Sequence, residues 1–154
     1  MLRTIYSTGC AALLAATSTI SGFSCPVAVM QDTAGIPVLV VSGENNHDWR
    51  WTTPSLVQIL EEADLFDVTV TYEPAKDLAD AEGLARYAAV VLDYNGARWG
   101  EAAETTFLDA VRHGLGVVVV HAADNHGPGW VEFEKLVGDL WRDGTGHGRF
   151  HPFH

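Results

Sequence analysis

The sequence predicts an α/β domain with a mainly parallel β-sheet. From residue 36 onward, strand-like segments alternate with helix-like segments, and three of the four strand-like segments are unbroken apolar runs rich in β-branched residues. Such runs are typical of strands buried on both faces, and strands that alternate with helices form βαβ units with right-handed crossovers. The 154 residues are enough for one domain of this kind.

The first strand, first helix and second strand each have a separate signal. Residues 36–42 form an apolar, β-branched run, and Pro37 is tolerated near the start of a strand, where a missing N–H donor costs little. Thr53 and Pro54 are typical of an N-cap and a first helical residue, so we expect a helix from there to residue 63. Apolar residues alternate with polar ones over 68–72, which predicts a second strand nearer an edge of the sheet.

The remaining elements follow in the same alternation. Residues 88–93 predict a third buried strand, and residues 101–113 predict a helix with acidic residues in its first turn and Gly114 at its end. Residues 117–121 form the most apolar strand of all, and residues 130–137 predict a short third helix. Four strands are few for an open sheet covered by helices on both faces, so we expect a fragment of a domain truncated at its C-terminus.

The first 35 residues differ from the rest in composition. Arg3 is the only charged residue before Asp32, and a short apolar stretch is followed by small residues up to Cys25. This order is typical of a secretory signal peptide, and the apolar stretch is too short for a transmembrane helix. We therefore predict a signal peptide over 1–25, a linker over 26–35, a domain over 36–154, and export to the periplasm or the medium. A lipid anchor at Cys25 and a buried N-terminal helix are the alternatives.

Charge and cysteine content argue against several classes of protein. The formal net charge is −11, from 20 acidic and 9 scattered basic residues, whereas nucleic-acid binders cluster Lys and Arg against phosphates. Both cysteines, Cys10 and Cys25, lie in or beside the predicted leader, which excludes a disulfide framework and a cysteine nucleophile inside the fold. Neither a phosphate-binding glycine motif nor a Gly-x-Ser-x-Gly nucleophile elbow follows a strand.

Polar side chains gather where ligands bind in parallel sheets, at the carboxyl ends of the strands. They follow the first, third and fourth strands and recur in a glycine-rich last loop; the candidates are Asn46, His47, Trp49, Asp93, Asn95, His121, Asp124 and His147. Each has a plainer structural alternative, because Asn and Asp stabilise turns and a histidine after a strand often bonds a backbone carbonyl. His113 is interpreted as a helix-end cation and His126, beside Gly127, as a loop residue.

Three segments resemble the ThuA-like (trehalose-utilisation) family, and a fourth resembles the part that follows in its longer exported members. They are Gly43-x3-His47-Asp48-Trp49, Gly114-x-Gly116-Val-Val-Val-Val-His121-Ala122-Ala123, Trp130-x2-Phe133-x2-Leu136-Val137-Gly138 and Gly144-x-Gly146-His147-Gly148-x2-His151-x-Phe153. The resemblance implies a flavodoxin-like three-layer sandwich, related to class I glutamine amidotransferases without their catalytic cysteine, and a role in sugar metabolism. It places His47 and His121 on the family's pocket histidines and His147 on its later loop, with Asp93 and Asn95 at the pocket edge.

Two functions follow as alternatives. The first is an exported enzyme, not a glutaminase, that acts on a carbohydrate or oxidised sugar with His121, His47 and Asp93 as catalytic residues. Asn46, Trp49, Asn95 and Asp124 would bind the substrate, and His47, His121 and His147 would hold a divalent metal such as Zn²⁺ if one is used. The second is a non-catalytic carbohydrate-binding domain in which Trp49, Trp51 and Trp99 stack on sugar rings. Neither alternative involves nucleic acid or a transmembrane helix.

Overall fold

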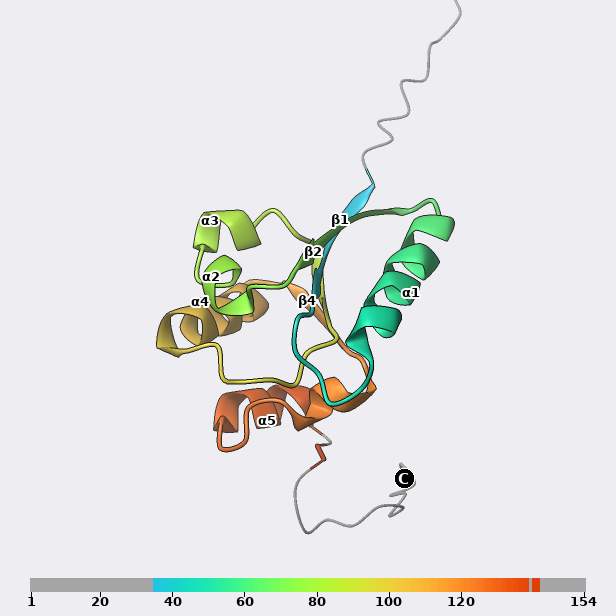
Figure 1. The fold of residues 1–154 in the computed structure, drawn as a ribbon. Helices are drawn as coiled ribbons and strands as arrows, with labels where there is room; N and C mark the ends of the chain where they lie inside the picture. The colour runs from blue at the N-terminus through green and yellow to red at the C-terminus, as the bar shows by residue number, and fades with distance from the viewer. Residues whose placement is uncertain (1–34, 139, 142–154) are drawn as a thin grey trace, which may run out of the picture. The chain divides into compact units, whose positions relative to one another are not determined.

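A computed structural model of the chain describes residues 35–138, 140 and 141, and every structural statement below concerns these residues. They form a four-stranded sheet flanked by helices (Figure 1). The strands are β1 (Ile36–Val41), β2 (Phe66–Thr71), β3 (Ala89–Leu92) and β4 (Gly116–Val119). The helices are α1 (Trp49–Glu62), α2 (Pro74–Asp77), α3 (Ala81–Leu84), α4 (Glu101–Arg112), the 3₁₀ helix η1 (His121–Asn125) and α5 (Val131–Val137).

All strand pairs of the sheet are parallel, and the strand order is β2-β1-β3-β4. The last residue of β1, Val41, pairs with Thr71 of β2 and Leu92 of β3, and Leu92 in turn pairs with Val119 of β4. The four carboxyl ends therefore lie in one row. The loops that follow β1, β3 and β4 leave the sheet at the same edge, which is the edge where the sequence places the candidate site.

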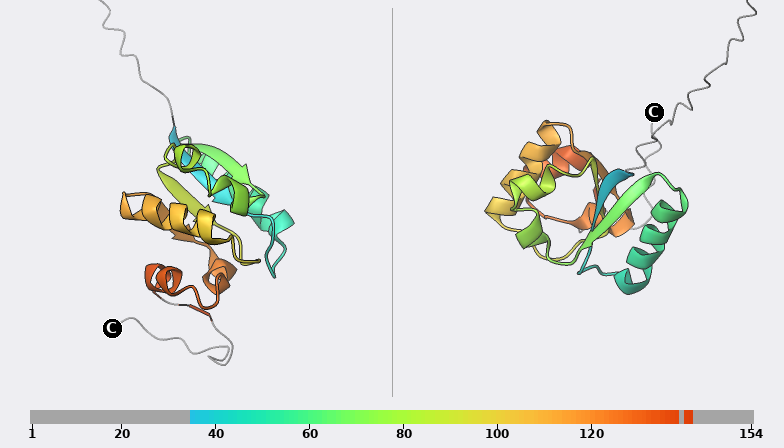
Figure 2. Two further views of the ribbon diagram at one scale, coloured as in Figure 1. Left: turned by 90° about the vertical axis from the view of Figure 1, so that its left-hand side faces the viewer. Right: turned by 90° about the horizontal axis from the view of Figure 1, so that it is seen from above.

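Helices cover both faces of the sheet, as the views from different sides agree (Figures 1 and 2). On one face Val38, Val40 and Val91 pack with partly buried residues of α1 such as Val57 and Leu60. The other face packs against α2 to α5 in a larger cluster of buried side chains, namely Leu39, Val41, Leu78, Leu84, Val90, Leu92, Tyr94, Trp99, Ala103, Phe107, Ala123, Trp130 and Phe133. The unbroken apolar runs of β1 and β3 are explained by this burial on two sides.

The predicted start of the first helix is wrong. Helix α1 begins at Trp49 with Asp48 as its N-cap, so Pro54 lies inside the helix rather than at its first position. The Asp48 carbonyl accepts the N–H groups of Trp51 and Thr52, which forms a helical turn before the proline. Thr53 does not cap the helix because its hydroxyl is buried and bonded to side chains that follow β1 and β3, as described below.

The fourth strand also differs from its prediction. β4 ends at Val119, and His121 begins η1 instead of ending the strand. Despite its apolar sequence β4 is half exposed, and Val118 is 51% exposed, because β4 has one strand neighbour in the described sheet and α1 packs over β1 and β2. The prediction of β2 as an edge strand is confirmed. None of the helices in the described part of the chain has the length and apolar character needed to span a bilayer.

Candidate functional site

Two histidines meet at the carboxyl edge of the sheet. His47 lies in the loop after β1, and His121 begins η1 after β4; their ring centroids are 4.8 Å apart and the ring planes are inclined by 39°. β1 and β4 are not neighbours, since β3 lies between them, so the two rings meet across the end of β3. Both side chains belong to exposed residues. The structure thus brings together two of the predicted site residues that are 74 positions apart in the sequence (121 − 47).

His121 adopts a backbone conformation that L-residues rarely use. Its φ is 37°, and Asp64 is the other non-glycine residue with positive φ among the described ones. The left-handed region costs a non-glycine residue about 1–2 kcal/mol. An exposed side chain contributes little packing to offset this cost, so the conformation is one that stability alone does not favour.

Asp93 is buried and accepts a network of hydrogen bonds directly after β3. It is 3% exposed and follows the end of β3. Its Oδ2 accepts hydrogen bonds from the hydroxyls of Thr52 and Thr53, each at 2.8 Å, and its Oδ1 accepts one from Asn45 Nδ2 at 3.1 Å. The Thr53 hydroxyl also lies 2.6 Å from that of Ser42. Both carboxylate oxygens are therefore occupied by donors from the β1 loop and the first turns of α1.

The loops after β1 and β3 are fastened to each other by a second set of contacts, which we call the loop clasp. Asn46 N donates to Asn95 Oδ1 at 3.0 Å, and Asn95 Nδ2 donates to Asn46 Oδ1 at 2.7 Å. Glu44 Oε2 accepts from Ala97 N at 3.2 Å, and the Glu44 carbonyl accepts from Asn95 N at 3.1 Å. The clasp gives the loop that carries His47 a defined place relative to β3.

Tyr94 supports the same clasp from below. Its hydroxyl donates to the Ala97 carbonyl at 3.0 Å and lies 3.5 Å from Glu44 Oε2. Burial of the ring, followed by the nearby Glu44 carboxylate, raises the pKa of Tyr94, so the phenol stays protonated and available as a donor.

The tryptophans divide between surface and core. Trp49 is half buried, its ring centroid is 5.9 Å from that of Tyr72, and the Arg50 guanidinium lies 4.3 Å from the Trp49 ring. Trp51, in the first turn of α1, is 68% exposed. Trp99, by contrast, is 4% exposed inside the larger core cluster, so the expectation that it stacks on a sugar is wrong. Its apolar ring is buried against Phe107 and the aromatic residues described next.

His126 lies in the loop after η1, as expected, but its side chain belongs to the core. It is fully buried, stacks on Trp99 with centroids 4.6 Å apart, and has its ring edge-on to Tyr94, Trp130 and Phe133. The interpretation of His113 agrees with its position, because it caps α4 and its Nδ1 lies 2.7 Å from the Asp109 carbonyl. Asp124 is half buried within η1.

Comparison with known proteins identifies the family. A family model described as ThuA, trehalose utilisation, matches residues 37–152. The chain belongs to the ThuA family.

A solved structure supports this membership. A ThuA-like protein from Parabacteroides merdae ATCC 43184, whose crystal structure was determined at 1.75 Å resolution, is 38% identical, with a TM-score of 0.64. The match covers 71% of this chain and 40% of that protein, so the chain spans less than half of its length. No curated protein matches the chain. The flavodoxin-like arrangement expected from the resemblance is confirmed, and membership of the ThuA family points to a role related to trehalose utilisation.

A metal site in this ThuA-family chain has two of its three expected ligands within the described residues. Two imidazoles that bind one tetrahedral ion through nitrogens at about 2.0–2.1 Å have ring centroids about 5 Å apart. The 4.8 Å between His47 and His121 fits this requirement. His147 lies outside the described residues, and within them no group of three or more His, Cys, Asp or Glu side chains is placed to hold an ion. The metal site stays a prediction.

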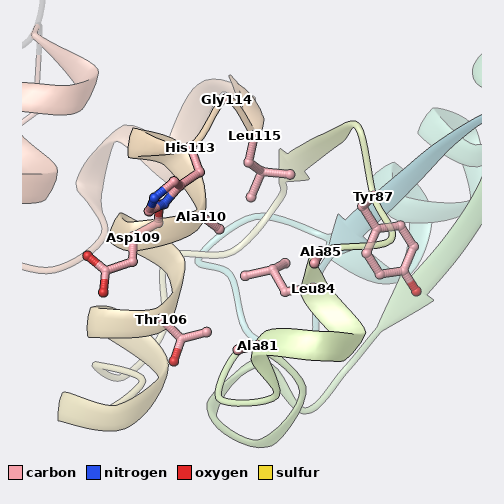
Figure 3. Close-up of a pocket in the computed structure, with 10 residues that line it drawn as sticks. All are labelled: Ala81, Leu84, Ala85, Tyr87, Thr106, Asp109, Ala110, His113, Gly114 and Leu115. Carbon is pink, nitrogen blue, oxygen red and sulfur yellow. The ribbon is translucent and has the colours of Figure 1, made fainter.

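A cavity of about 480 Å³ lies elsewhere in the chain, between α3 and α4 (Figure 3). Its lining includes Leu84 and Ala110, with Tyr87 just before β3 and Leu115 just before β4. It therefore opens at the amino ends of these strands, away from the histidine pair. Ligands of parallel sheets bind at the other edge, so we assign the candidate site to the histidines despite the size of this cavity.

Sequence reasoning missed the residues that hold the site in place. Asn45, Thr52 and Thr53 bond the buried Asp93, and Glu44 fastens the clasp. A polar loop of Gly, Glu and Asn has the same composition whether its side chains face water or a buried carboxylate. One signal was present, because two threonines precede Pro54 in a segment that is otherwise helical. Threonine is a weak helix former, and its hydroxyl often bonds a group outside the helix.

Proposed function

We propose that this ThuA-family chain acts on a carbohydrate or an oxidised sugar derivative at the carboxyl edge of its sheet. The observation that carries the proposal is the pair of exposed imidazoles, His47 and His121, whose centroids lie 4.8 Å apart although they come from loops after non-neighbouring strands. The unfavourable φ of His121 supports a functional role, because strain of this kind concentrates at functional sites. The family's connection with trehalose utilisation supports sugars as the ligand class.

The chemistry follows from imidazole and from the loops around it. Imidazole can both accept and donate a proton near neutral pH, so a sugar hydroxyl within about 2.6–3.2 Å of His121 would donate a hydrogen bond to the ring, and the ring would take up the proton as that oxygen forms its new bond in the reaction. The ring N–H of His47 would donate a hydrogen bond to a substrate oxygen on which negative charge develops. The amides of Asn46 and Asn95, the ring of Trp49 and the carboxylate of Asp124 would bind the remaining sugar groups. Asp93, whose oxygens accept three hydrogen bonds from the chain itself, would hold the site together instead of transferring a proton.

A divalent ion such as Zn²⁺, when bound, would polarise a substrate oxygen and lower the pKa of a substrate hydroxyl. His47 and His121 would be two of its ligands and His147 the third. In this version the two rings would hold the ion instead of accepting a proton from the substrate.

The test replaces each histidine by glutamine, which has a similar size but no imidazole. We expect His47→Gln and His121→Gln each to weaken binding of trehalose or gluconate at least tenfold in calorimetry and to abolish any turnover. The matched control is His113→Gln, an exposed histidine at the end of α4, which should behave as the wild type. Metal analysis of the same three proteins separates the two versions, because loss of bound zinc in both site variants supports the ligand role. Unchanged sugar binding in both site variants would contradict the proposal.

A second function has an observation in its favour. Trp51 is 68% exposed and Tyr72 is 55% exposed, and Tyr72, which directly follows β2, lies beside Trp49. Exposed aromatic rings near one edge of the sheet suit a carbohydrate-binding domain without catalysis. In that case Trp51→Ala and Tyr72→Ala should each weaken sugar binding severalfold, Ile59→Ala (64% exposed) should not, and the wild type should show no turnover. Turnover of a sugar by the wild type would contradict this second function.

We also propose that the chain is exported. The support is the composition break near residue 35, with Arg3 as the only early charge and small residues before Cys25. The predicted leader, the predicted linker up to residue 34 and the site of a lipid anchor at Cys25 lie outside the described residues.

A further inference from the structure

Asn45 lies between a buried carboxylate and the backbone of a site histidine. Its Nδ2 donates to Asp93 Oδ1 at 3.1 Å, while its Oδ1 accepts the His47 N–H at 2.9 Å. Each end of one amide group is thus used, and the two bonds run in a single chain from Asp93 through Asn45 to His47. The Asn45 residue is half buried, and its bond to Asp93 is partly buried, whereas its bond from the His47 N–H is exposed.

Asp93 is a suitable anchor for such a chain of hydrogen bonds. It is 3% exposed, directly follows β3, and is held from a second direction by the hydroxyls of Thr52 and Thr53 in the first turns of α1. A buried carboxylate with three donors cannot move without leaving an unsatisfied charge, which is costly. Its position is therefore set by the sheet and by α1 together.

We infer that Asn45 is the positioning residue of the site: it transmits the fixed place of Asp93 to the His47 backbone and so holds the two imidazoles 4.8 Å apart. The inference rests on the proposed function, because the distance between the two rings matters only if both rings contact the same sugar or metal ion. It assigns a role to Asn45, which was not among the predicted site residues. It also makes Asp93 an anchor of the site instead of a catalytic residue.

The directions of the hydrogen bonds permit an exchange test. Asp93→Asn alone keeps a satisfied arrangement, in which its side-chain oxygen accepts from Asn45 Nδ2 and its amide nitrogen donates to the two threonine hydroxyls, which accept as well as donate. Asn45→Asp alone places two carboxylates together. The double variant Asn45→Asp with Asp93→Asn satisfies every bond again. Its new amide at position 93 donates to the new carboxylate at position 45 and accepts the threonine hydroxyls through its oxygen. That carboxylate still accepts the His47 N–H.

The readout is the distance between the rings, measured as the nuclear Overhauser effect between their ring protons in the full chain. We expect the effect in the wild type and in Asp93→Asn, its loss in Asn45→Ala and Asn45→Asp, and its return in the double variant. Hydrogen exchange of the His47 amide should accelerate at least tenfold in Asn45→Ala and in Asn45→Asp. Gln58→Ala is the control, because it removes an amide side chain whose bond, to Glu62 of the same helix, belongs neither to this chain of bonds nor to the clasp.

The outcomes separate the inference from the proposed function. Cooperative thermal melting of each variant shows that it is folded. A folded Asn45→Ala variant that keeps the ring-to-ring effect, or a folded double variant that does not regain it, overturns the inference. A wild type that shows the effect but binds neither trehalose nor gluconate overturns the proposed function and leaves the positioning role standing.

Discussion

At the scale of single residues, His121 combines an unfavourable backbone with an exposed ring that lies beside His47. Its φ of 37° is one that glycine adopts without cost, whereas a Cβ makes it unfavourable. A stability-driven choice for this position would be glycine. The histidine is explained by what its ring does at the sheet edge, beside a second imidazole.

This strain predicts the order of stability among His121 variants. His121→Gly should be more stable than His121→Ala by about 1 kcal/mol in urea unfolding, because only glycine relieves the left-handed conformation. Both variants should lose sugar binding.

Asp64 is the control for this prediction, with a φ of 52° at an exposed turn before β2. Asp64→Gly should likewise exceed Asp64→Ala in stability, and neither change should affect sugar binding. Equal stability of the two His121 variants would show that the residue is not strained in solution.

At the scale of elements, the site depends on loops that are fastened to each other and to helices. The clasp joins the loops after β1 and β3, and Asp93 joins the end of β3 to the first turns of α1. Arg98 makes a further connection between this loop and the helices. It bonds both carboxylate oxygens of Glu104 in α4, and its guanidinium lies 5.1 Å from the Trp130 ring before α5. The loop between β3 and α4 is thus held at both ends.

Gly96 permits the close approach within the clasp. A Cβ at this position would lie 2.2 Å from Glu44 Oε2 and 2.6 Å from Glu44 Cβ, so Glu44 would have to move and give up its bond to Ala97 N. We expect Gly96→Ala to lower the free energy of unfolding by about 1–2 kcal/mol and to weaken sugar binding.

A double-variant cycle checks the cause of the Gly96 effect. Glu44→Gly removes every Glu44 atom that the new Cβ would meet, so the cost of Gly96→Ala should shrink by at least about 0.5 kcal/mol in that background. Strict additivity of the two changes would contradict the proposed contact.

The Arg98–Glu104 pair predicts a dependence of stability on pH. The hydrogen bonds from Arg98 hold the pKa of Glu104 below its usual value, against the opposing effect of burial. A carboxyl whose pKa is lowered by folding stabilises the fold fully above its unfolded pKa of about 4.3, and this contribution is lost as the pH falls through the lower folded value. Urea unfolding from pH 7 to pH 3 should show this loss in the wild type and a smaller loss in Glu104→Gln. Identical pH profiles would contradict the assignment.

At the scale of the whole molecule, the chain combines a ThuA-family domain with an N-terminal segment of different composition. The family match begins at residue 37, and the structural match covers 40% of the Parabacteroides merdae protein. The composition break near residue 35 thus coincides with the start of the family domain. This coincidence is what a cleaved leader in front of a folded domain would produce.

Export predicts the N-terminus of the mature protein. N-terminal sequencing of the chain recovered from its native host should find a start close to Cys25 or a few residues later, in the periplasmic or extracellular fraction. Arg3→Glu should reduce the exported amount, because the leader needs a positive charge before its apolar stretch. An intact Met1 on cytosolic protein would contradict the prediction.

Much of the fold was determined by the sequence itself. The apolar runs of β1 and β3 require burial on both faces whatever their neighbours are, so they predict a parallel sheet covered by helices. Because the carboxyl ends of parallel strands share one edge, the same patterns place His47, Asp93 and His121 near one another. Short helices such as α2 and α3 have too few residues for a periodic signal, and they were missed.

Only the tertiary structure decided what each polar residue at that edge does. Asn45 and Asp93 are separated by 48 residues, so no local pattern shows that one donates to the other or that the Asp93 carboxylate is buried. Trp99 enters the core for the same reason: its partners come from other elements, while an exposed and a buried tryptophan look alike in sequence. Helix propensity places the start of α1 at Thr53, but hydrogen bonds to Asp93 outweigh that preference, because a buried charge without donors costs more than a displaced helix cap.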